Sequence, residues 1–179
     1  RKYLPILSGE WGYSDIWMGM DMQKQGRYLP RQWLTNLTND VFLSIWYDWK
    51  NDGPDPHERE HNFGTVYPDL TPKPAYHAVQ TLTRELAGYA IAERLPMERS
   101  QDWVLVLTNQ TGETKLAAWT LEPPRAVTLV VEGPQPPDGW RLVEGTGQTR
   151  RLEPDQNRLR LELEAMPRYI SLGRGRIRR

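Results

Sequence analysis

Hydrophobic positions divide the chain into two halves with different periods. In the first half, residues 3–9 and 41–46 are nearly continuous apolar runs that predict strands. Each is followed by helical spacing, around residues 29–37 and, behind two prolines, at 75–86. Strand, helix, strand, helix with apolar strands is typical of parallel βα units buried on both faces. Two units cannot cover both faces of a sheet, so we expect a larger α/β array whose earlier strands lie outside this sequence.

After Gly88 the pattern changes to short strands separated by turn residues. The predicted strands are 89–95, 103–108, 115–121, 126–131, 141–143, 159–163 and 169–172. Residues 158–164 alternate polar and apolar side chains, as expected of a strand with one solvated face. We therefore predict a first domain at 1–87, a small antiparallel β-domain at 88–173, built as a sandwich, and a basic, frayed tail at 174–179.

Composition narrows the function classes. The chain has 8 Trp and 8 Tyr against 2 Phe, and such side chains serve both cores and sugar-stacking surfaces. With 23 basic and 23 acidic residues the net charge is zero, which argues against a nucleic-acid binder. No cysteine is present for disulfides or thiol chemistry, and no apolar run approaches the roughly 20 residues of a membrane span. The compartment stays open, with a secreted or cell-surface location slightly favoured.

Glu10 is the main candidate for chemistry. It ends the first apolar run, between glycines and aromatic rings, and Trp46 ends the second run. In a parallel barrel the carboxyl ends of neighbouring strands open onto one cavity, where functional residues gather. A carboxylate there suits attack on a sugar, with an exposed loop acid as the alternative for Glu10. For Trp46, at the end of an apolar run, the plain interpretation from the residues is a core side chain.

Four motifs resemble those of a glycoside hydrolase. Residues 8–13 and 44–49 look like the seventh and eighth strands of a clan A enzyme. Residues 60–64 and 71–76 are similar to the closing loop and last barrel helix of cellulase-like (family 5) and xylosidase-like (family 39) members. The resemblance implies the last two βα units of a (β/α)8 TIM barrel, followed by a small antiparallel β-sandwich. It also implies a retaining O-glycosidase acting on β-linked sugars.

The resemblance assigns roles to residues. Glu10 matches the nucleophile, and Trp46 matches the floor of the subsite that holds the attacked sugar. Further candidates for substrate contact come from the two loops: Trp11, Tyr13, Asp48, Trp49, Lys50, Asn51 and Asp52. The clan's acid/base glutamate follows an asparagine, and no Asn-Glu pair occurs here. We therefore expect that residue to come from an N-terminal barrel portion outside this sequence, leaving the isolated chain inactive towards its glycoside, oligosaccharide or polysaccharide substrate.

Two other interpretations compete with this one. Residues 57–61 match the zincin pattern His-Glu-x-x-His in letters, but they follow a Gly-Pro-Asp-Pro segment without an apolar helical stripe. A surface loop is expected there, and no metal or cofactor. The alternative function is a non-catalytic carbohydrate-binding or accessory fragment that retains its aromatic residues for sugar contact. Five tryptophans are expected to serve packing: Trp17, Trp33, Trp103, Trp119 and Trp140.

Overall fold

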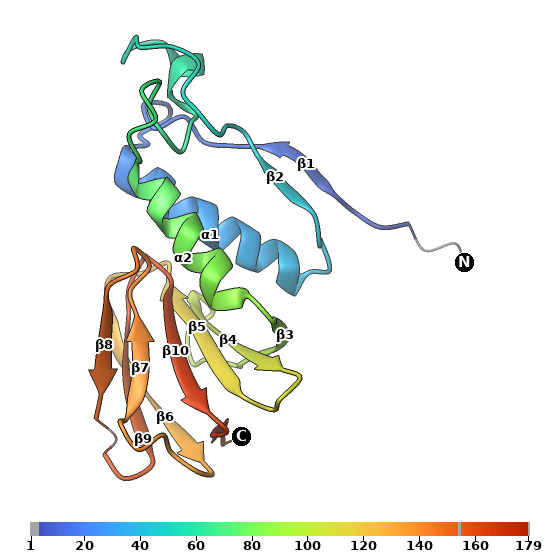
Figure 1. Cartoon of the computed structure of the whole chain (residues 1–179), viewed down its shortest axis with the longest axis vertical. Helices are drawn as coiled ribbons and strands as arrows, with labels where there is room; N and C mark the ends of the chain where they lie inside the picture. The colour runs from blue at the N-terminus through green and yellow to red at the C-terminus, as the bar shows by residue number, and fades with distance from the viewer. Residues whose placement is uncertain (1–3, 154, 179) are drawn as a thin grey trace. The chain divides into compact units, whose positions relative to one another are not determined.

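The computed structural model describes residues 4–153 and 155–178, which form two compact units (Figure 1). The first unit comprises residues 1–81 and the second residues 82–179. The boundary lies inside helix α2, which spans Pro74–Leu86. No helix in the described part of the chain is long and apolar enough to cross a membrane.

The first unit confirms the predicted order of strand, helix, strand and helix. Strands β1 (Ser8–Trp11) and β2 (Ser44–Trp46) pair in parallel, and helix α1 (Met22–Thr38) connects them (Figure 1). A short 3-10 helix, η1 (Arg59–Asn62), lies in the long loop between β2 and α2. The parallel pair confirms the βα character of this half of the chain.

The prediction that both strands are buried is wrong for this chain. The strands are shorter than the apolar runs, since residues 4–7 and 41–43 lie outside them, and residue 3 lies outside the described residues. Six apolar side chains of these runs are exposed: Leu4, Ile6, Leu7, Phe42, Leu43 and Ile45. The physical reason is that a two-stranded sheet leaves each strand with one unpaired edge and too few neighbours to cover its faces.

Local sequence explains where α1 begins and how it packs. Asp21 caps its first turn, because a carboxylate oxygen accepts a hydrogen bond of 2.7 Å from the backbone N–H of Lys24. The buried face carries Leu29 and Leu34. A Cβ atom at Gly26 would lie 3.1 Å from the Cβ of Pro74, so glycine lets α1 approach the start of α2 closely.

The second unit is an antiparallel β-domain. Its strands are β3 (Tyr89–Arg94), β4 (Asp102–Asn109), β5 (Thr114–Thr120), β6 (Arg125–Glu132), β7 (Trp140–Val143), β8 (Thr149–Leu152), β9 (Arg158–Leu163), β10 (Arg168–Gly173) and β11 (Arg176–Ile177). A six-stranded sheet has the order β3-β4-β5-β10-β7-β8, and a three-stranded sheet has the order β11-β6-β9. All seven predicted strands are confirmed. The sequence pattern missed β8 and β11, which are short and rich in arginine.

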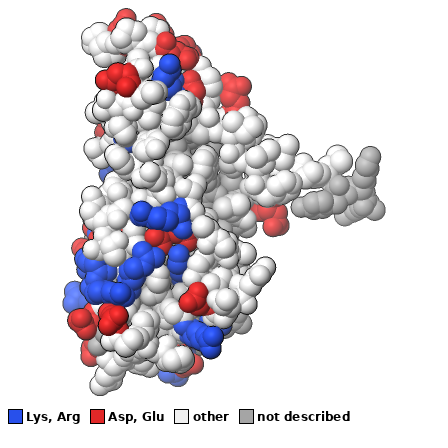
Figure 2. Space-filling model, viewed as in Figure 1, with Lys and Arg blue, Asp and Glu red and all other residues white. Residues whose placement is uncertain are grey.

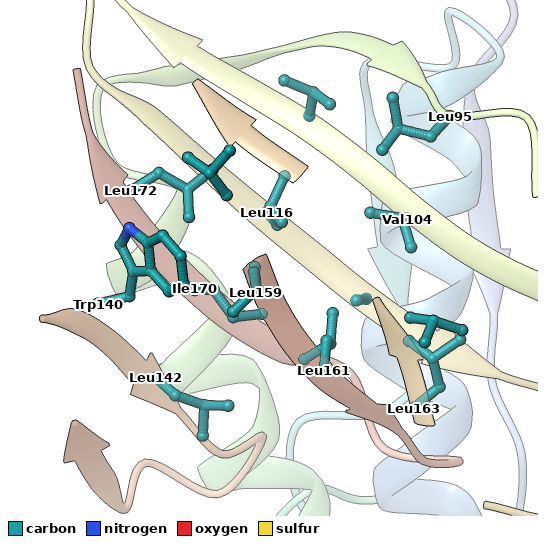
Figure 3. Close-up of a cluster of buried hydrophobic side chains, with 14 residues drawn as sticks. Leu95, Val104, Leu116, Trp140, Leu142, Leu159, Leu161, Leu163, Ile170 and Leu172 are labelled. Atoms are coloured by element: carbon teal, nitrogen blue, oxygen red, sulfur yellow. The ribbon is translucent and has the colours of Figure 1, made fainter. Parts of the chain in front are cut away.

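Apolar side chains from both sheets meet in one core, as in a sandwich (Figure 3). From the smaller sheet, Leu159, Leu161 and Leu163 of β9 point into it, while the polar residues between them are exposed. Ile170 and Leu172 of β10 are among the residues that face them from the larger sheet. The alternation predicted for residues 158–164 is therefore confirmed.

The frayed tail predicted at 174–179 is wrong for Arg176 and Ile177, while residue 179 lies outside the described residues. These two residues form β11, antiparallel to Val131 and Glu132 of β6. Ile177 packs against the sandwich core. The free energy gained by burying Ile177 and by pairing with β6 exceeds the conformational entropy that a frayed terminus would keep.

A buried acid, Glu85, joins the end of α2 to the larger sheet within the second unit. Its carboxylate contacts Nζ of Lys115 at 3.1 Å and Nη2 of Arg141 at 2.6 Å. Burial alone would raise the pKa of Glu85, but hydrogen bonds from both cations and their charges lower it below its usual range. Tyr169 is buried too, and its hydroxyl has no hydrogen-bond partner among the described residues. Burial, with a smaller effect of the Glu85 charge, raises the pKa of Tyr169.

Charges on the surface are mixed in sign. Figure 2 shows Lys and Arg side chains gathered over the β-domain with Asp and Glu side chains beside them. Two ion pairs of this domain show the same mixture, since Arg150 and Arg168 both contact Glu144. The β-domain therefore carries paired charges of both signs.

Candidate active site

A cavity of about 770 Å³ lies beside the end of β1. Three predicted site residues line it: Glu10, Trp11 and Tyr13. Most of the remaining wall is aromatic or thioether: Trp17, Met18, Met20, Tyr28, Tyr47 and Phe63. Arg59 and Glu60 of η1 complete the charged part of the lining. The cavity thus presents a carboxylate within a largely apolar wall.

Tyr13 is the centre of an aromatic cluster. Its ring centroid lies 6.1 Å from that of Trp11, 5.3 Å from that of Tyr28 and 5.9 Å from that of Trp46. The Trp11 and Tyr28 rings meet the Tyr13 ring edge-on, an arrangement that aromatic pairs prefer. Trp46 does not line the cavity itself but lies one ring behind it, half-buried, with no hydrogen-bond partner for its indole N–H among the described residues. The structure therefore brings Glu10 and Trp46 close to one cavity, linked by Tyr13.

The loop that follows β1 is tied to the loop that follows β2. A Cβ atom at Gly12 would lie 1.5 Å from the carbonyl oxygen of Tyr47, so only glycine fits there. The Ser14 hydroxyl donates to the carbonyl of Arg59 at 2.9 Å. Nε2 of Gln25 donates to the carbonyl of Tyr13 at 2.8 Å. These contacts fix the cavity wall to the loop after β2, to η1 and to α1.

A buried ion pair anchors the same loops, and sequence reasoning missed it. Nζ of Lys73 lies 2.9 Å from a carboxylate oxygen of Asp15, with exposures of 0% and 6% for the two side chains. The ammonium also donates to Oδ1 of Asn51 at 3.3 Å and to the carbonyl of Asn62 at 3.4 Å. Burial lowers the pKa of Lys73, and the hydrogen bond and charge of Asp15 offset part of this effect. No local signal marks this pair, because its partners are distant in the sequence.

The predicted contacts after β2 do not line the cavity. The Tyr47–Asp48 peptide bond is cis, and the Asp48 carbonyl accepts from the Thr65 N–H at 3.1 Å. Trp49 is 58% exposed, with its ring centroid 5.8 Å from that of Tyr76. Lys50 forms an isolated β-bridge to Val66. The remaining two predicted contacts are Asn51 and Asp52.

Asn51 and Asp52 illustrate how these positions act instead. The Asn51 side chain is only 3% exposed and is bound to Lys73, so it holds the loop and does not face the cavity. Asp52 is exposed and accepts a hydrogen bond of 3.2 Å from the Tyr47 hydroxyl. Burial, followed by this hydrogen bond, raises the pKa of Tyr47. The loop therefore positions the Tyr47 side chain, which does line the cavity.

The segment that matches the zincin letters supplies part of the cavity wall. Its second half forms η1, and Nδ1 of His61 accepts from the Asp55 N–H at 3.3 Å. Within the described ranges, no group of three or more His, Cys, Asp or Glu side chains is placed to hold a metal ion. The Arg59 guanidinium lies 4.9 Å from the centroid of the Trp17 ring, and its Nε donates to Glu60 at 2.8 Å. Trp17, expected to serve packing, is instead 45% exposed at the cavity.

This arrangement suits binding of a sugar and attack by one carboxylate. Aromatic faces stack on the C–H faces of a pyranose, and Glu10 is the one carboxylate among the described lining residues that no cation holds. Glu60 is the other, and it pairs with Arg59. The described cavity therefore offers one free carboxylate.

The chain is similar to solved glycosidase structures. No protein-family model matches it, and a search of curated proteins finds no match. An endo-beta1,6-glucanase shares the fold at 12% identity and a TM-score of 0.53, covering 91% of this chain and 34% of its own. A family 39 glycoside hydrolase from the gut symbiont Bacteroides cellulosilyticus WH2 is 31% identical, with a TM-score of 0.77 over 96% of this chain and 34% of that one. The chain spans about a third of the length of these two enzymes. The likeness at 31% identity confirms the resemblance to part of a clan A glycoside hydrolase.

Proposed function

We propose that this chain is the nucleophile-bearing part of a retaining O-glycoside hydrolase that cleaves β-linked sugars. In this proposal β1 and β2 are strands seven and eight of a (β/α)8 barrel, residues 1–87 belong to that barrel, 88–173 form the accessory β-domain, and 174–179 form its basic end. The observation that carries the proposal is the parallel strand pair that presents Glu10 to an aromatic cavity. The 31% identity to a family 39 glycoside hydrolase supports it.

The mechanism is a double displacement. The Glu10 carboxylate attacks the anomeric carbon and forms a glycosyl ester, while the leaving oxygen takes a proton from a second carboxyl group. Water, deprotonated by that same group, then cleaves the ester and regenerates both carboxyl groups. Retention requires the two groups to lie about 5–5.5 Å apart. Glu60 is held by Arg59, so we assign the acid/base role to a residue outside this sequence and expect the isolated chain to be inactive.

The exposed apolar runs support the barrel. Six large apolar side chains around β1 and β2 face solvent in this chain, although soluble domains rarely leave such contiguous surface uncovered. Further strands on both edges of the pair would cover them and complete its unpaired backbone groups. An N-terminal barrel portion is therefore the partner that we propose for this unit.

Substrate contacts follow from the aromatic cluster. Trp11 and Tyr13 line the cavity, and Trp46 supports them, so these three form the platform beneath the attacked sugar. Asp48, Trp49, Lys50 and Asp52 remain candidates for contacts with more distant sugar units. Asn51 acts by holding the loop.

Azide rescue tests the nucleophile. The protein that carries this sequence together with its upstream barrel strands is assayed against aryl β-glycosides. We expect Glu10→Ala to lower kcat/KM by about 10⁴-fold. Azide, which fits the space left by the carboxylate, should restore turnover and yield an α-glycosyl azide. The matched control is Glu60→Gln, which alters the other carboxylate of the cavity and should retain activity within about tenfold.

Two results would count against the proposal. Retained hydrolysis in Glu10→Ala would remove Glu10 from the mechanism. The second is sugar binding by calorimetry without turnover in the wild-type protein. That result would favour the non-catalytic carbohydrate-binding alternative, for which the aromatic cluster around Tyr13 is the supporting observation.

A further inference from the structure

One end of the cavity is lined by apolar side chains that recognition of a sugar does not require. In the loop between β1 and α1, Ile16, Trp17 and Met18 are consecutive and exposed by 42%, 45% and 81%. Trp17 and Met18 line the same cavity as Glu10, together with Met20. Apolar side chains that line a cavity together with a candidate catalytic carboxylate favour an apolar ligand group at that end.

Two backbone hydrogen bonds close the loop that carries these side chains. The N–H of Trp17 donates to the carbonyl of Ser14 at 3.3 Å, and the N–H of Met20 donates to the carbonyl of Trp17 at 3.0 Å. Met18 has a φ of 52°, in the left-handed region that non-glycine residues adopt at a cost. A compact turn therefore presents the most exposed apolar side chain of the cavity.

The two charged side chains at this end pair with each other. The Arg59 guanidinium lies over the Trp17 ring and binds Glu60. The Ser14 hydroxyl is buried and donates to the carbonyl of Arg59. Sugar hydroxyls require several free donors and acceptors, whereas this end offers an indole and two thioethers.

We propose that the substrate is a β-glycoside with an apolar alkyl or aryl aglycone, which Trp17, Met18 and Met20 hold. This inference rests on the proposed function. Flexible thioethers adapt to chains and rings of different shape, and the indole supplies a rigid apolar surface. The reaction consumes the glycoside and water and releases the sugar and the aglycone as an alcohol, with the proton from the acid/base group on its oxygen.

A series of n-alkyl β-glycosides tests the proposal, with the sugar that the full-length enzyme hydrolyses best. From ethyl to octyl the leaving alcohols have nearly equal acidity, so chain length changes burial and not the chemistry of departure. We expect kcat/KM to rise about twofold to fourfold per CH₂ until the apolar end is filled. In Met18→Ser and Trp17→Ser the ratio of octyl to ethyl kcat/KM should fall towards one. Leu37→Ser, at an exposed apolar residue of α1 outside the cavity, should keep the wild-type ratio.

The outcomes separate this inference from the proposed function. Hydrolysis without dependence on chain length overturns the inference and leaves the glycosidase standing, with Trp17 and Met18 then covered by another part of the protein. A dependence on chain length that survives in both serine variants also overturns it, because other residues would then hold the aglycone. No hydrolysis of any glycoside overturns the proposed function and this inference with it.

Discussion

The buried ion pair beside the cavity gives the sharpest prediction about stability. Lys73→Met keeps most of the volume of the side chain and removes the ammonium. The Asp15 carboxylate, 6% exposed and 2.9 Å from that ammonium, then lies buried without its cation. Oδ1 of Asn51 and the carbonyl of Asn62 lose a donor at the same time.

The magnitude follows from these contacts. Removing one partner of a buried pair costs about 3–5 kcal/mol, because the other charge stays uncompensated. Asp15→Asn is the complementary variant: it leaves the Lys73 ammonium, 0% exposed, without its carboxylate, so we expect a loss of similar size, about 3–5 kcal/mol. The double variant should lose less than the sum of both, by about 2 kcal/mol, because no isolated carboxylate is left.

Urea unfolding followed by tryptophan fluorescence measures these free energies. Hydrogen exchange adds a local readout, since the Asp15 N–H donates to the carbonyl of Asn62 at 3.2 Å and should exchange faster in Lys73→Met. A loss below about 1 kcal/mol together with unchanged exchange of that amide would refute the reasoning. It would mean that the loop is held by its backbone contacts and not by the ion pair.

Three further predictions concern the site and the β-domain. Gly12→Ala should lower kcat/KM of the full-length enzyme at least tenfold, because its Cβ meets the carbonyl oxygen of Tyr47 at 1.5 Å. In the isolated chain Gly9→Ala, with nothing within 4 Å of its Cβ, should leave the free energy of unfolding unchanged, whereas Gly12→Ala should lower it. Glu85→Gln should lower the free energy of unfolding at pH 7 by about 3 kcal/mol. Since the folded pKa of Glu85 is lowered, its contribution is lost as pH falls below about 4, and urea unfolding from pH 7 to 3 should show a flatter acid decline in this variant. Tyr169→Phe should unfold within about 1 kcal/mol of wild type at pH 7, since its hydroxyl lacks a described partner. Because the pKa of Tyr169 is raised in the folded state, the wild-type protein should lose stability as pH rises above about 10. Urea unfolding at about pH 10.5 should therefore show a smaller loss of stability, relative to pH 7, in Tyr169→Phe than in the wild type.

Local periodicity determined most of the architecture of this protein. The alternation at 158–164 became β9 with its three leucines in the core, and the order of the first four elements followed from apolar spacing. Glu10 could be singled out as a candidate because a carboxylate between glycines and aromatic residues at the end of an apolar run is unusual. These signals lie within a few residues of one another, so the sequence carries them directly.

Contacts between distant residues were decided by the tertiary structure alone. The pairing of Asp15 with Lys73 and the position of the Arg59 guanidinium over Trp17 join separate loops, and no spacing rule connects them. Asn51 looked like a substrate contact from its place after a strand, but its side chain is buried against Lys73. Whether a loop side chain faces a cavity or holds the loop depends on which partners the fold brings to it. That choice is made by packing, so the sequence identified the nucleophile candidate while the folded chain determined the cavity around it.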